Sequence, residues 1–293
     1  MNFSIGVALG KRFLRLRVAR QNCENEMRQA KLFVNIGGTT RLSRPIMGRV
    51  FYLPEGEIMK ELKFLSSGGA LNLDMGSNCS FLKHKKNLLL IDCCEDAAKK
   101  LLKLNLFNGV ENFYLALTHM HFDHTAGIGT LIWYCTFVLN LKIKIIINSN
   151  KFKKNLIKFL KLGGVDVGFV EFVKQSDFRF DDLTLKMLKT EHAQGLECYG
   201  IMFKDCDGEY YYTGDTKDLK TIQKFSTQES VKKIYCEVSD YGYGSHLCYE
   251  DLKKLNKEKL IFMHFNSIEL YKTIVKDGFK VAKVEKEKIC KTK

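Results

Sequence analysis

Residues 118 to 127, Thr-His-Met-His-Phe-Asp-His-Thr-Ala-Gly, bring three of the chain's seven histidines and an aspartate close together. A single histidine in an apolar stretch is usually a core residue with one hydrogen-bond partner. Three are harder to bury, because each imidazole needs its own partner or loses hydration energy. A metal ion would give all four side chains a partner at once, since imidazole and carboxylate groups are zinc ligands. The stretch predicts a metal site at His119, His121, Asp123 and His124.

A site for two metal ions needs more than these four ligands, because side chains of one short loop point in different directions. Further ligands are expected where other strands end, and three residues fit: His192, Asp215 and His264. Taken alone, Asp215 would more often cap a helix that begins near Lys217, and each histidine would more often be structural. Taken together, the three stand in the order that a single site requires.

Two histidines lie outside this set. His84 lies in LKHKKN, a polar turn between two predicted strands, and is expected at the surface. His246 lies in SDYGYGSHLCYEDL, a glycine-rich loop between a predicted strand and a predicted helix. Its flexible backbone could bring the imidazole over the metal ions. The alternative is a histidine close to the cap of the helix.

Short apolar strands alternate with amphipathic helices from about residue 63 onward. The continuous apolar run at 87–93 predicts a strand covered on both faces, and the run at 113–119 predicts a strand that ends at the first histidine of the cluster. Layered α/β folds bind ligands beyond the carboxyl ends of strands. The other predicted strands are 142–148, 168–173, 183–192, 198–204, 209–215, 233–239 and 259–265, and the predicted helices are 95–104, 125–139, 150–162, 217–225, 249–257 and 267–277.

The composition is that of a globular protein with a net charge of +14, from 47 Lys and Arg against 33 Asp and Glu. A positive field concentrates phosphate-bearing substrates, but the spread of the lysines along the chain is also explained by a solvated basic surface. Ten scattered cysteines without a CxxC pair indicate reduced thiols and a cytoplasmic location. The longest apolar runs are too short to span a bilayer, so no membrane contact is expected.

The predicted ligands resemble those of the metallo-β-lactamase superfamily, whose HxHxDH signature stands here at 119–124. His192, Asp215 and His264 match the later ligand positions of the family in order. The resemblance implies an α/β fold, the αββα sandwich, in which two mixed β-sheets lie face to face and are flanked by helices. Residues 61–293 would form this hydrolase domain, leaving 1–60 as an N-terminal extension of unknown role.

The segment from CEVSD to LIFMHFNS is similar to the phosphodiesterase branch that includes RNase Z and cyclic-nucleotide phosphodiesterases. Ser245 and His246 stand where that branch carries a serine-histidine pair that contacts the substrate phosphate. RNase Z carries a long RNA-binding arm between two of its ligands, whereas here His192 and Asp215 are only 23 positions apart. The resemblance therefore favours small phosphodiesters, cyclic nucleotides among them, over RNA 3′ ends.

The resemblance also implies how the ligands divide between two Zn²⁺ ions, with Mn²⁺ or Fe²⁺ as alternatives. One ion would have the ligands His119, His121 and His192, and the other Asp123, His124 and His264, with Asp215 bridging the two. A hydroxide that bridges the metals would attack phosphorus, and Asp123 would help to orient it. His246 would bind the phosphate and protonate the leaving alkoxide.

Two other functions remain open. Hydrolysis of a lactone or thioester is the first, because the same nucleophile attacks carbonyls and a fold does not fix a substrate; His246 has no obvious role in that reaction. A non-enzymatic binding protein is the second, and the complete set of ligands argues against it. Relatives in this branch often pair, so a homodimer is expected.

Overall fold

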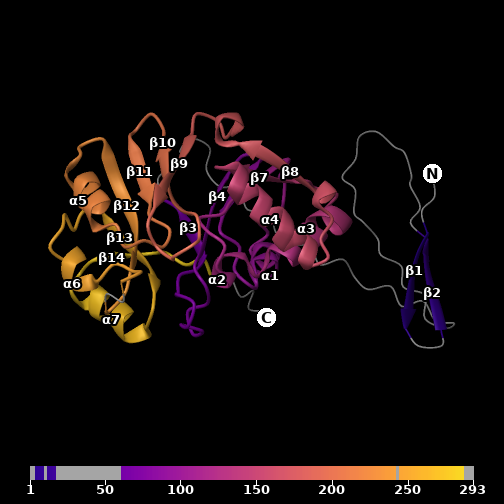
Figure 1. Cartoon of the computed structure of the whole chain (residues 1–293), viewed down its shortest axis with the longest axis horizontal. Helices are drawn as coiled ribbons and strands as arrows, with labels where there is room; N and C mark the ends of the chain where they lie inside the picture. Colours follow the sequence, from indigo (N-terminus) through magenta and orange to yellow (C-terminus); the bar gives the residue numbers. More distant parts are fainter. Residues whose placement is uncertain (1–3, 10–11, 18–60, 242–243, 287–293) are drawn as a thin grey trace, which may run out of the picture. The chain divides into compact units, whose positions relative to one another are not determined.

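The computed structural model describes residues 4–9, 12–17, 61–241 and 244–286 of the chain (Figure 1). The chain divides into two compact units, Met1–Met47 and Gly48–Lys293. In the first unit β1 (Ser4–Leu9) and β2 (Arg12–Arg17) pair as an antiparallel hairpin. The boundary expected between residues 60 and 61 lies at the edge of the described residues and stays a prediction.

Two six-stranded sheets form the centre of the second unit. The first sheet has the order β3-β4-β5-β6-β7-β8, in which β5 to β8 are parallel and β3 and β4 antiparallel to their neighbours. Its strands are β3 (Lys63–Ser66), β4 (Cys79–His84), β5 (Asn87–Ile91), β6 (Asn112–Ala116), β7 (Ile143–Ile147) and β8 (Val170–Lys174).

The second sheet has the order β14-β13-β12-β11-β10-β9 and is also mixed, because β11 to β14 are parallel whereas β10 is antiparallel to both of its neighbours. Its strands are β9 (Thr184–Thr190), β10 (Cys198–Lys204), β11 (Glu209–Tyr212), β12 (Val231–Val238), β13 (Leu260–Phe265) and β14 (Lys280–Val281).

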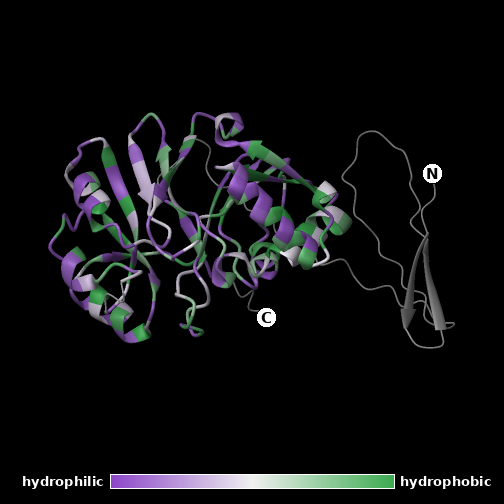
Figure 2. Ribbon diagram, viewed as in Figure 1, coloured by the Kyte–Doolittle hydropathy of each residue, from purple (hydrophilic) through white to green (hydrophobic). Residues whose placement is uncertain are grey.

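Helices cover the outer faces of the two sheets (Figure 1). Of the longer helices, α4 packs on β7 of the first sheet, and α5 and α7 pack on β12 and β13 of the second. Figure 2 shows that these helices mix hydrophilic and hydrophobic residues, as expected where one helix face covers a sheet. The helices are α1 (Ala97–Lys103), α2 (Phe122–Thr125), α3 (Ile128–Tyr134), α4 (Asn150–Leu162), α5 (Leu219–Thr227), α6 (Tyr249–Leu252) and α7 (Ile268–Lys276).

One apolar core lies between the sheets. It joins fully buried side chains of the first sheet, such as Leu89 and Ile145, to Tyr212 and Met263 of the second. A separate cluster under α5, α6 and α7 includes Phe262. This layering confirms the αββα sandwich with two mixed sheets. Among the described residues, no helix has the length and apolar character needed to cross a bilayer.

The strands that precede the candidate ligands end at one edge of the sandwich. β6 leads to His119, β9 to His192, β11 to Asp215, and β13 ends beside His264. β9 and β11 are both antiparallel to β10 and therefore run in the same direction. Carboxyl ends of strands with one direction meet at one edge, so the fold itself collects these residues.

Three local predictions differ from the structure. The helix expected at 125–139 is divided into α2, α3 and a π-helical turn at Cys135–Leu139. The break before α3 falls at Gly127, whose N–H donates to the backbone oxygen of Cys93 in the β5–α1 loop at 3.1 Å instead of continuing the helix from α2. The helix expected at 249–257 ends at Leu252. His84 is not a free surface residue, because its side chain is only 11% exposed and Nδ1 lies 2.7 Å from Asp181 Oδ2.

We predict that Gly127→Ala destabilises the fold by about 1–3 kcal/mol, the usual cost of overpacking. A Cβ at residue 127 would lie 2.0 Å from the backbone oxygen of Cys94. Thermal or urea unfolding measures the effect. Gly129→Ala is the matched control, because its Cβ meets only Val165 Cγ2 at 3.5 Å. Exchange of glycine for alanine inside a helix raises the free energy of unfolding by about 0.5–1 kcal/mol, so the control should be slightly more stable. Equal stability of the two variants would contradict the prediction.

Candidate metal centre

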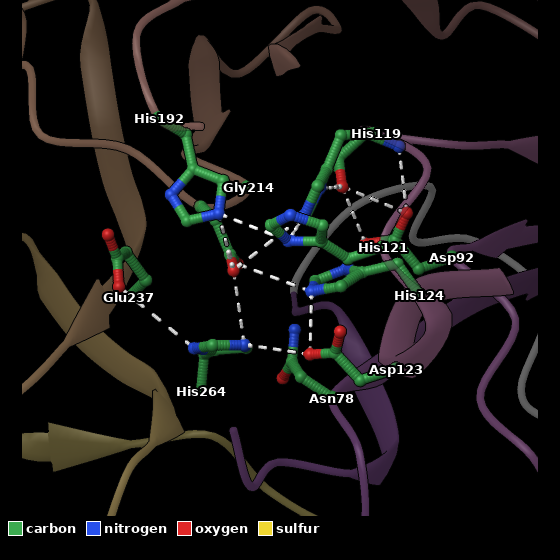
Figure 3. A network of polar contacts seen from close by, with 12 residues as sticks. Asn78, Asp92, His119, His121, Asp123, His124, His192, Gly214, Glu237 and His264 are labelled. Carbon is green, nitrogen blue, oxygen red and sulfur yellow. Dashed lines mark hydrogen bonds and ion pairs between the residues drawn. The ribbon is translucent and has the colours of Figure 1, made fainter. Parts of the chain in front are cut away.

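The first ligand group is formed by His119, His121, His192 and Asp215, whose ligand atoms all lie within 4.8 Å of one another. His121 Nδ1 lies 2.9 Å from His119 Nε2 and 3.3 Å from His192 Nε2. Asp215 Oδ2 completes the group, 3.9 Å from His119 Nε2 and 3.7 Å from His192 Nε2. His119 and His121 follow a strand of the first sheet and His192 a strand of the second, and the three rings point toward one another (Figure 3).

The second ligand group is formed by Asp123, His124, His264 and the same Asp215. His124 Nε2 lies 3.1 Å from Asp123 Oδ2 and 3.4 Å from Asp215 Oδ1. His264 Nε2 lies 3.4 Å from Asp123 Oδ2 and 3.3 Å from Asp215 Oδ2. Asp215 therefore stands between the two groups. All seven predicted ligands are brought together.

The spacing and the unpaired atoms of both groups fit a metal cofactor. Two ligands of a tetrahedral zinc ion, each about 2.1 Å from the metal, lie about 3.4 Å apart, close to the separations in the second group. His124 Nε2 and Asp215 Oδ1 are buried without a hydrogen-bond partner. Buried polar atoms without partners are costly, and a cation would serve both. The helix-cap alternative for Asp215 fails, because Asp218 caps α5 by accepting from Thr221 N.

Hydrogen bonds to the second ring nitrogen orient three of the histidines. His124 Nδ1 lies 2.8 Å from Asp92 Oδ2, and His119 Nδ1 lies 3.1 Å from Thr118 Oγ1. His192 Nδ1 lies 2.7 Å from the backbone oxygen of Ser245, to which it donates. In each ring Nε2 is left to face the centre. Such contacts fix the tautomer of a metal-binding histidine and raise its basicity.

Asp92 is a functional residue that the sequence interpretation missed. It is fully buried directly after β5, in the left-handed conformation with φ +62°. Besides His124 it accepts hydrogen bonds from Thr118 N at 2.7 Å and from Thr118 Oγ1. A signal was present in LLLIDCC, because an aspartate at the end of a buried strand needs several donors. What it orients could not be known without the fold.

Glu237 is a second missed residue. Its side chain is fully buried in β12, and Oε2 lies 2.8 Å from His246 Nδ1. The same oxygen lies 4.0 Å from His264 Nδ1 (Figure 3). Its other oxygen accepts from Thr216 N at 2.9 Å. The signal was an acid inside the apolar strand KIYCEVS. Glu237 thus joins the predicted catalytic histidine to the metal centre.

His264 occupies an irregular position of β13. The pairing with β12 shifts register between Glu237 and Val238, where Met263 and Phe265 are the partners. His264 is the extra residue and takes φ +54°. A bulge of this kind re-aims a side chain, and here it turns the imidazole toward Asp123 and Asp215. The cost of a left-handed histidine is offset where surrounding contacts hold it.

Burial and the neighbouring charges shift the pKa values of the ligand residues in different directions. Burial lowers the pKa of His119 well below its ordinary value, and His124 adds to the effect. Burial opposes charge on His124 too, but Asp215 and Asp92 outweigh it and raise its pKa. Burial would raise the pKa of Asp215, yet His264 and His124 lower it well below its ordinary value. Burial would also raise the pKa of Asp123, but its hydrogen bonds with His124 and His264 lower it well below its ordinary value. Both carboxylates that face the centre are thus ionised, as metal ligands must be.

His246 lies at the exposed side of this centre. Its ring stands 4.7 Å from that of His192 and 5.6 Å from that of His264, centroid to centroid. Burial disfavours its charged form, but the hydrogen bond and the charge of Glu237 raise its pKa to about 9. His246 does lie close to the start of α6, two residues before the N-cap Cys248, but its side chain pairs with Glu237 and not with the helix end.

Solved structures with this architecture are metallo-β-lactamase-fold proteins, and the fold of this chain is theirs. The metallo-β-lactamase fold protein YhfI from Bacillus subtilis has a TM-score of 0.60 at 17% identity, covering 77% of this chain and 96% of that one. Human tRNase Z, short form, has a TM-score of 0.53 at 16% identity, covering 77% of this chain and 96% of that one. A diphosphatase of the PhnP family has a TM-score of 0.57 at 15% identity, covering 77% of this chain and 94% of that one. No curated protein matches the sequence.

The family within this fold is shown by sequence. The chain belongs to the family of the Anti-Pycsar protein Apyc1, whose model matches residues 60–288. The match takes in both sheets and every residue of the two ligand groups. The resemblance to the metallo-β-lactamase superfamily is therefore confirmed.

We predict that Asp92→Asn lowers metal affinity about 10- to 100-fold, as loss of a ligand's orienting partner usually does. His124 would keep its place but lose the carboxylate that fixes its Nδ1 proton. Competition of the purified protein with a chelator measures the affinity. Asp181→Asn is the matched control, because Asp181 forms a similar pair with His84 away from the centre. Equal affinity of the two variants would show that Asp92 does not orient the ligand.

Proposed function

We propose that the protein is a dinuclear metal-dependent phosphodiesterase that hydrolyses small or cyclic nucleotides. The observation that carries the proposal is His246, whose Nδ1 is held by the buried Glu237 beside the two ligand groups. The membership in the Anti-Pycsar family supports a cyclic nucleotide as substrate. A similar fold in human tRNase Z and in a PhnP-family diphosphatase is consistent with phosphate ester chemistry.

The ligand groups would each hold one divalent cation, with zinc preferred by the nitrogen and carboxylate ligands and Mn²⁺ or Fe²⁺ as alternatives. When bound, such cations supply an acidified water and neutralise charge on the phosphate. The chain supplies the geometry for this chemistry. Asp215 would be shared by both cations, because it faces histidines of both groups. Oδ1 lies 3.4 Å from His124 Nε2, and Oδ2 lies 3.9 Å and 3.7 Å from Nε2 of His119 and His192.

His246 would protonate the leaving oxygen. Glu237 accepts from Nδ1 and so leaves the Nε2 proton directed away from Glu237, toward a bound phosphate. A positioned general acid contributes about 10² to 10⁴ in rate. Asp123, whose Oδ2 lies within 3.4 Å of both His124 and His264, would help to orient the attacking water. Ser245 would contact the phosphate beside His246.

The two rival substrates fit the chain less well. The connection between β9 and β10 is short, running from Glu191 to Glu197, so no RNA-binding arm stands at this point. An RNA 3′-end endonuclease of the RNase Z kind is thus disfavoured. Lactone or thioester hydrolysis gives no duty to the Glu237–His246 pair. The homodimer and the cytoplasmic location expected from the sequence stay predictions.

The decisive experiment offers the purified metal-loaded protein 3′,5′-cyclic nucleotides, bis(p-nitrophenyl) phosphate, a homoserine lactone and an unprocessed transfer RNA. The proposal expects hydrolysis of the first two, lost with chelator and regained with Zn²⁺ or Mn²⁺. Turnover of the lactone alone would show that the protein is an ester hydrolase and not a phosphodiesterase. Cleavage of the RNA alone would favour the endonuclease.

We predict that His246→Ala keeps the metal content and lowers kcat about 10²- to 10⁴-fold with a poor leaving group. The activated ester bis(p-nitrophenyl) phosphate, whose leaving group needs no proton, should be affected much less. Metal analysis and steady-state kinetics on both substrates measure this. His84→Ala is the matched control, because His84 also pairs with one carboxylate but lies away from the centre. Release of metal from His246→Ala, or an equal loss on both substrates, would refute the acid role.

A further inference from the structure

The loop that carries Ser245 and His246 is closed at its neck by backbone bonds. It runs from the end of β12 to the start of α6. Ser239 N donates to Leu247 O at 2.9 Å, and Tyr249 N donates to Ser239 O at 2.9 Å. These bonds fix where the loop leaves and rejoins the fold. They do not by themselves fix the positions of Ser245 and His246 relative to the metal centre.

The loop needs a further support, because part of its backbone is permissive. Gly244 lies directly before Ser245 and takes φ +68°, with no heavy atom within 4 Å of the position of a Cβ. Glycine adopts such conformations at little cost and resists none of the alternatives. Yet the backbone oxygen of Ser245 must meet His192 Nδ1 at 2.7 Å, and His246 must meet Glu237.

A polar clasp on the other side of the loop gives that support. Asp240, the first residue beyond the neck, forms a reciprocal pair with Asn266, which follows His264 by two positions. Asn266 Nδ2 donates to Asp240 Oδ1 at 2.6 Å, and Asp240 N donates to Asn266 Oδ1 at 3.2 Å. Ser267 Oγ donates to Asp240 Oδ2 at 3.2 Å. Hydrogen bonds that involve a charged carboxylate are stronger than neutral ones.

The place of the clasp on α7 adds to its strength. Ser267 is the N-cap of α7 and accepts from Leu270 N at 3.1 Å. The carboxylate of Asp240 thus lies at the positive end of the helix dipole, where anions are stabilised. The chain from His264 to Ser267 therefore carries a metal ligand at one end and the support of the loop at the other.

We infer that Asp240 and Asn266 are positioning residues that hold Ser245 and His246 in register with the metal centre. The inference rests on the proposed function for its effect on turnover, but not for its effect on metal. Because the backbone oxygen of Ser245 orients His192, a displaced loop also weakens a ligand of the first group. Neither residue touches the reacting atoms. They act on the centre only through the positions of Ser245 and His246.

The test exchanges the two side chains. Asn266→Asp sets two carboxylates against each other and should lower kcat about tenfold, the equivalent of one charge-assisted hydrogen bond, with a smaller change in KM. Loss of zinc to a chelator should become faster by a similar factor. The double variant Asp240→Asn with Asn266→Asp restores one donor and one acceptor, and should regain most of both. Asp240→Asn alone should fall between.

Asp251→Asn is the control, because the exposed Asp251 side chain of α6 pairs with Lys254 just beyond the helix and its loss should change neither readout. Melting temperatures confirm that each variant is folded. Wild-type kinetics and zinc retention in Asn266→Asp would overturn the inference, and so would a double variant no better than the single. If the wild-type protein hydrolyses no phosphodiester, the proposed function fails, while zinc retention and its rescue still decide the role of the clasp.

Discussion

The metal centre depends on the relative position of the two sheets at one edge, because each sheet supplies only part of the ligands. Backbone hydrogen bonds fix this position close to the ligands. Phe265 N donates to Ser67 O at 3.0 Å, and Gly69 N donates to Phe265 O at 2.8 Å. The segment after β14 adds a tie at β3, where Glu285 N donates to Phe64 O at 2.8 Å. Backbone hydrogen bonds thus join the two sheets next to His264, a residue of the second ligand group.

Two buried carboxylates carry the next level of organisation. Asp92 and Glu237 are fully buried, which is costly for ionisable groups unless they have several partners. Each is satisfied by backbone donors on one side and by a histidine on the other. The hydrogen bond that satisfies each buried carboxylate is therefore the same bond that orients the imidazole.

The sequence predicted much of this arrangement, because the main signals are local. The continuous apolar strands, the HxHxDH loop and the ligand at each strand end can be read without knowing which strands are neighbours. Asp92 and Glu237 were missed, since their partners lie 32 and 9 positions away and become visible only in three dimensions. The break at Gly127 was missed for a related reason. Its cause is a backbone oxygen of another loop, which no helical pattern reveals.

Glu237 places the proposed acid next to the second ligand group. One of its oxygens faces His246 at 2.8 Å and His264 at 4.0 Å, so one carboxylate both holds the proposed acid and lies beside a metal ligand. The loop that carries His246 adds a second contact, between the backbone oxygen of Ser245 and His192 of the first group. Both ligand groups are therefore tied to the residues that would meet the phosphate. A substrate that leaves His246 idle would make no use of these ties, and this favours a phosphodiester over a lactone.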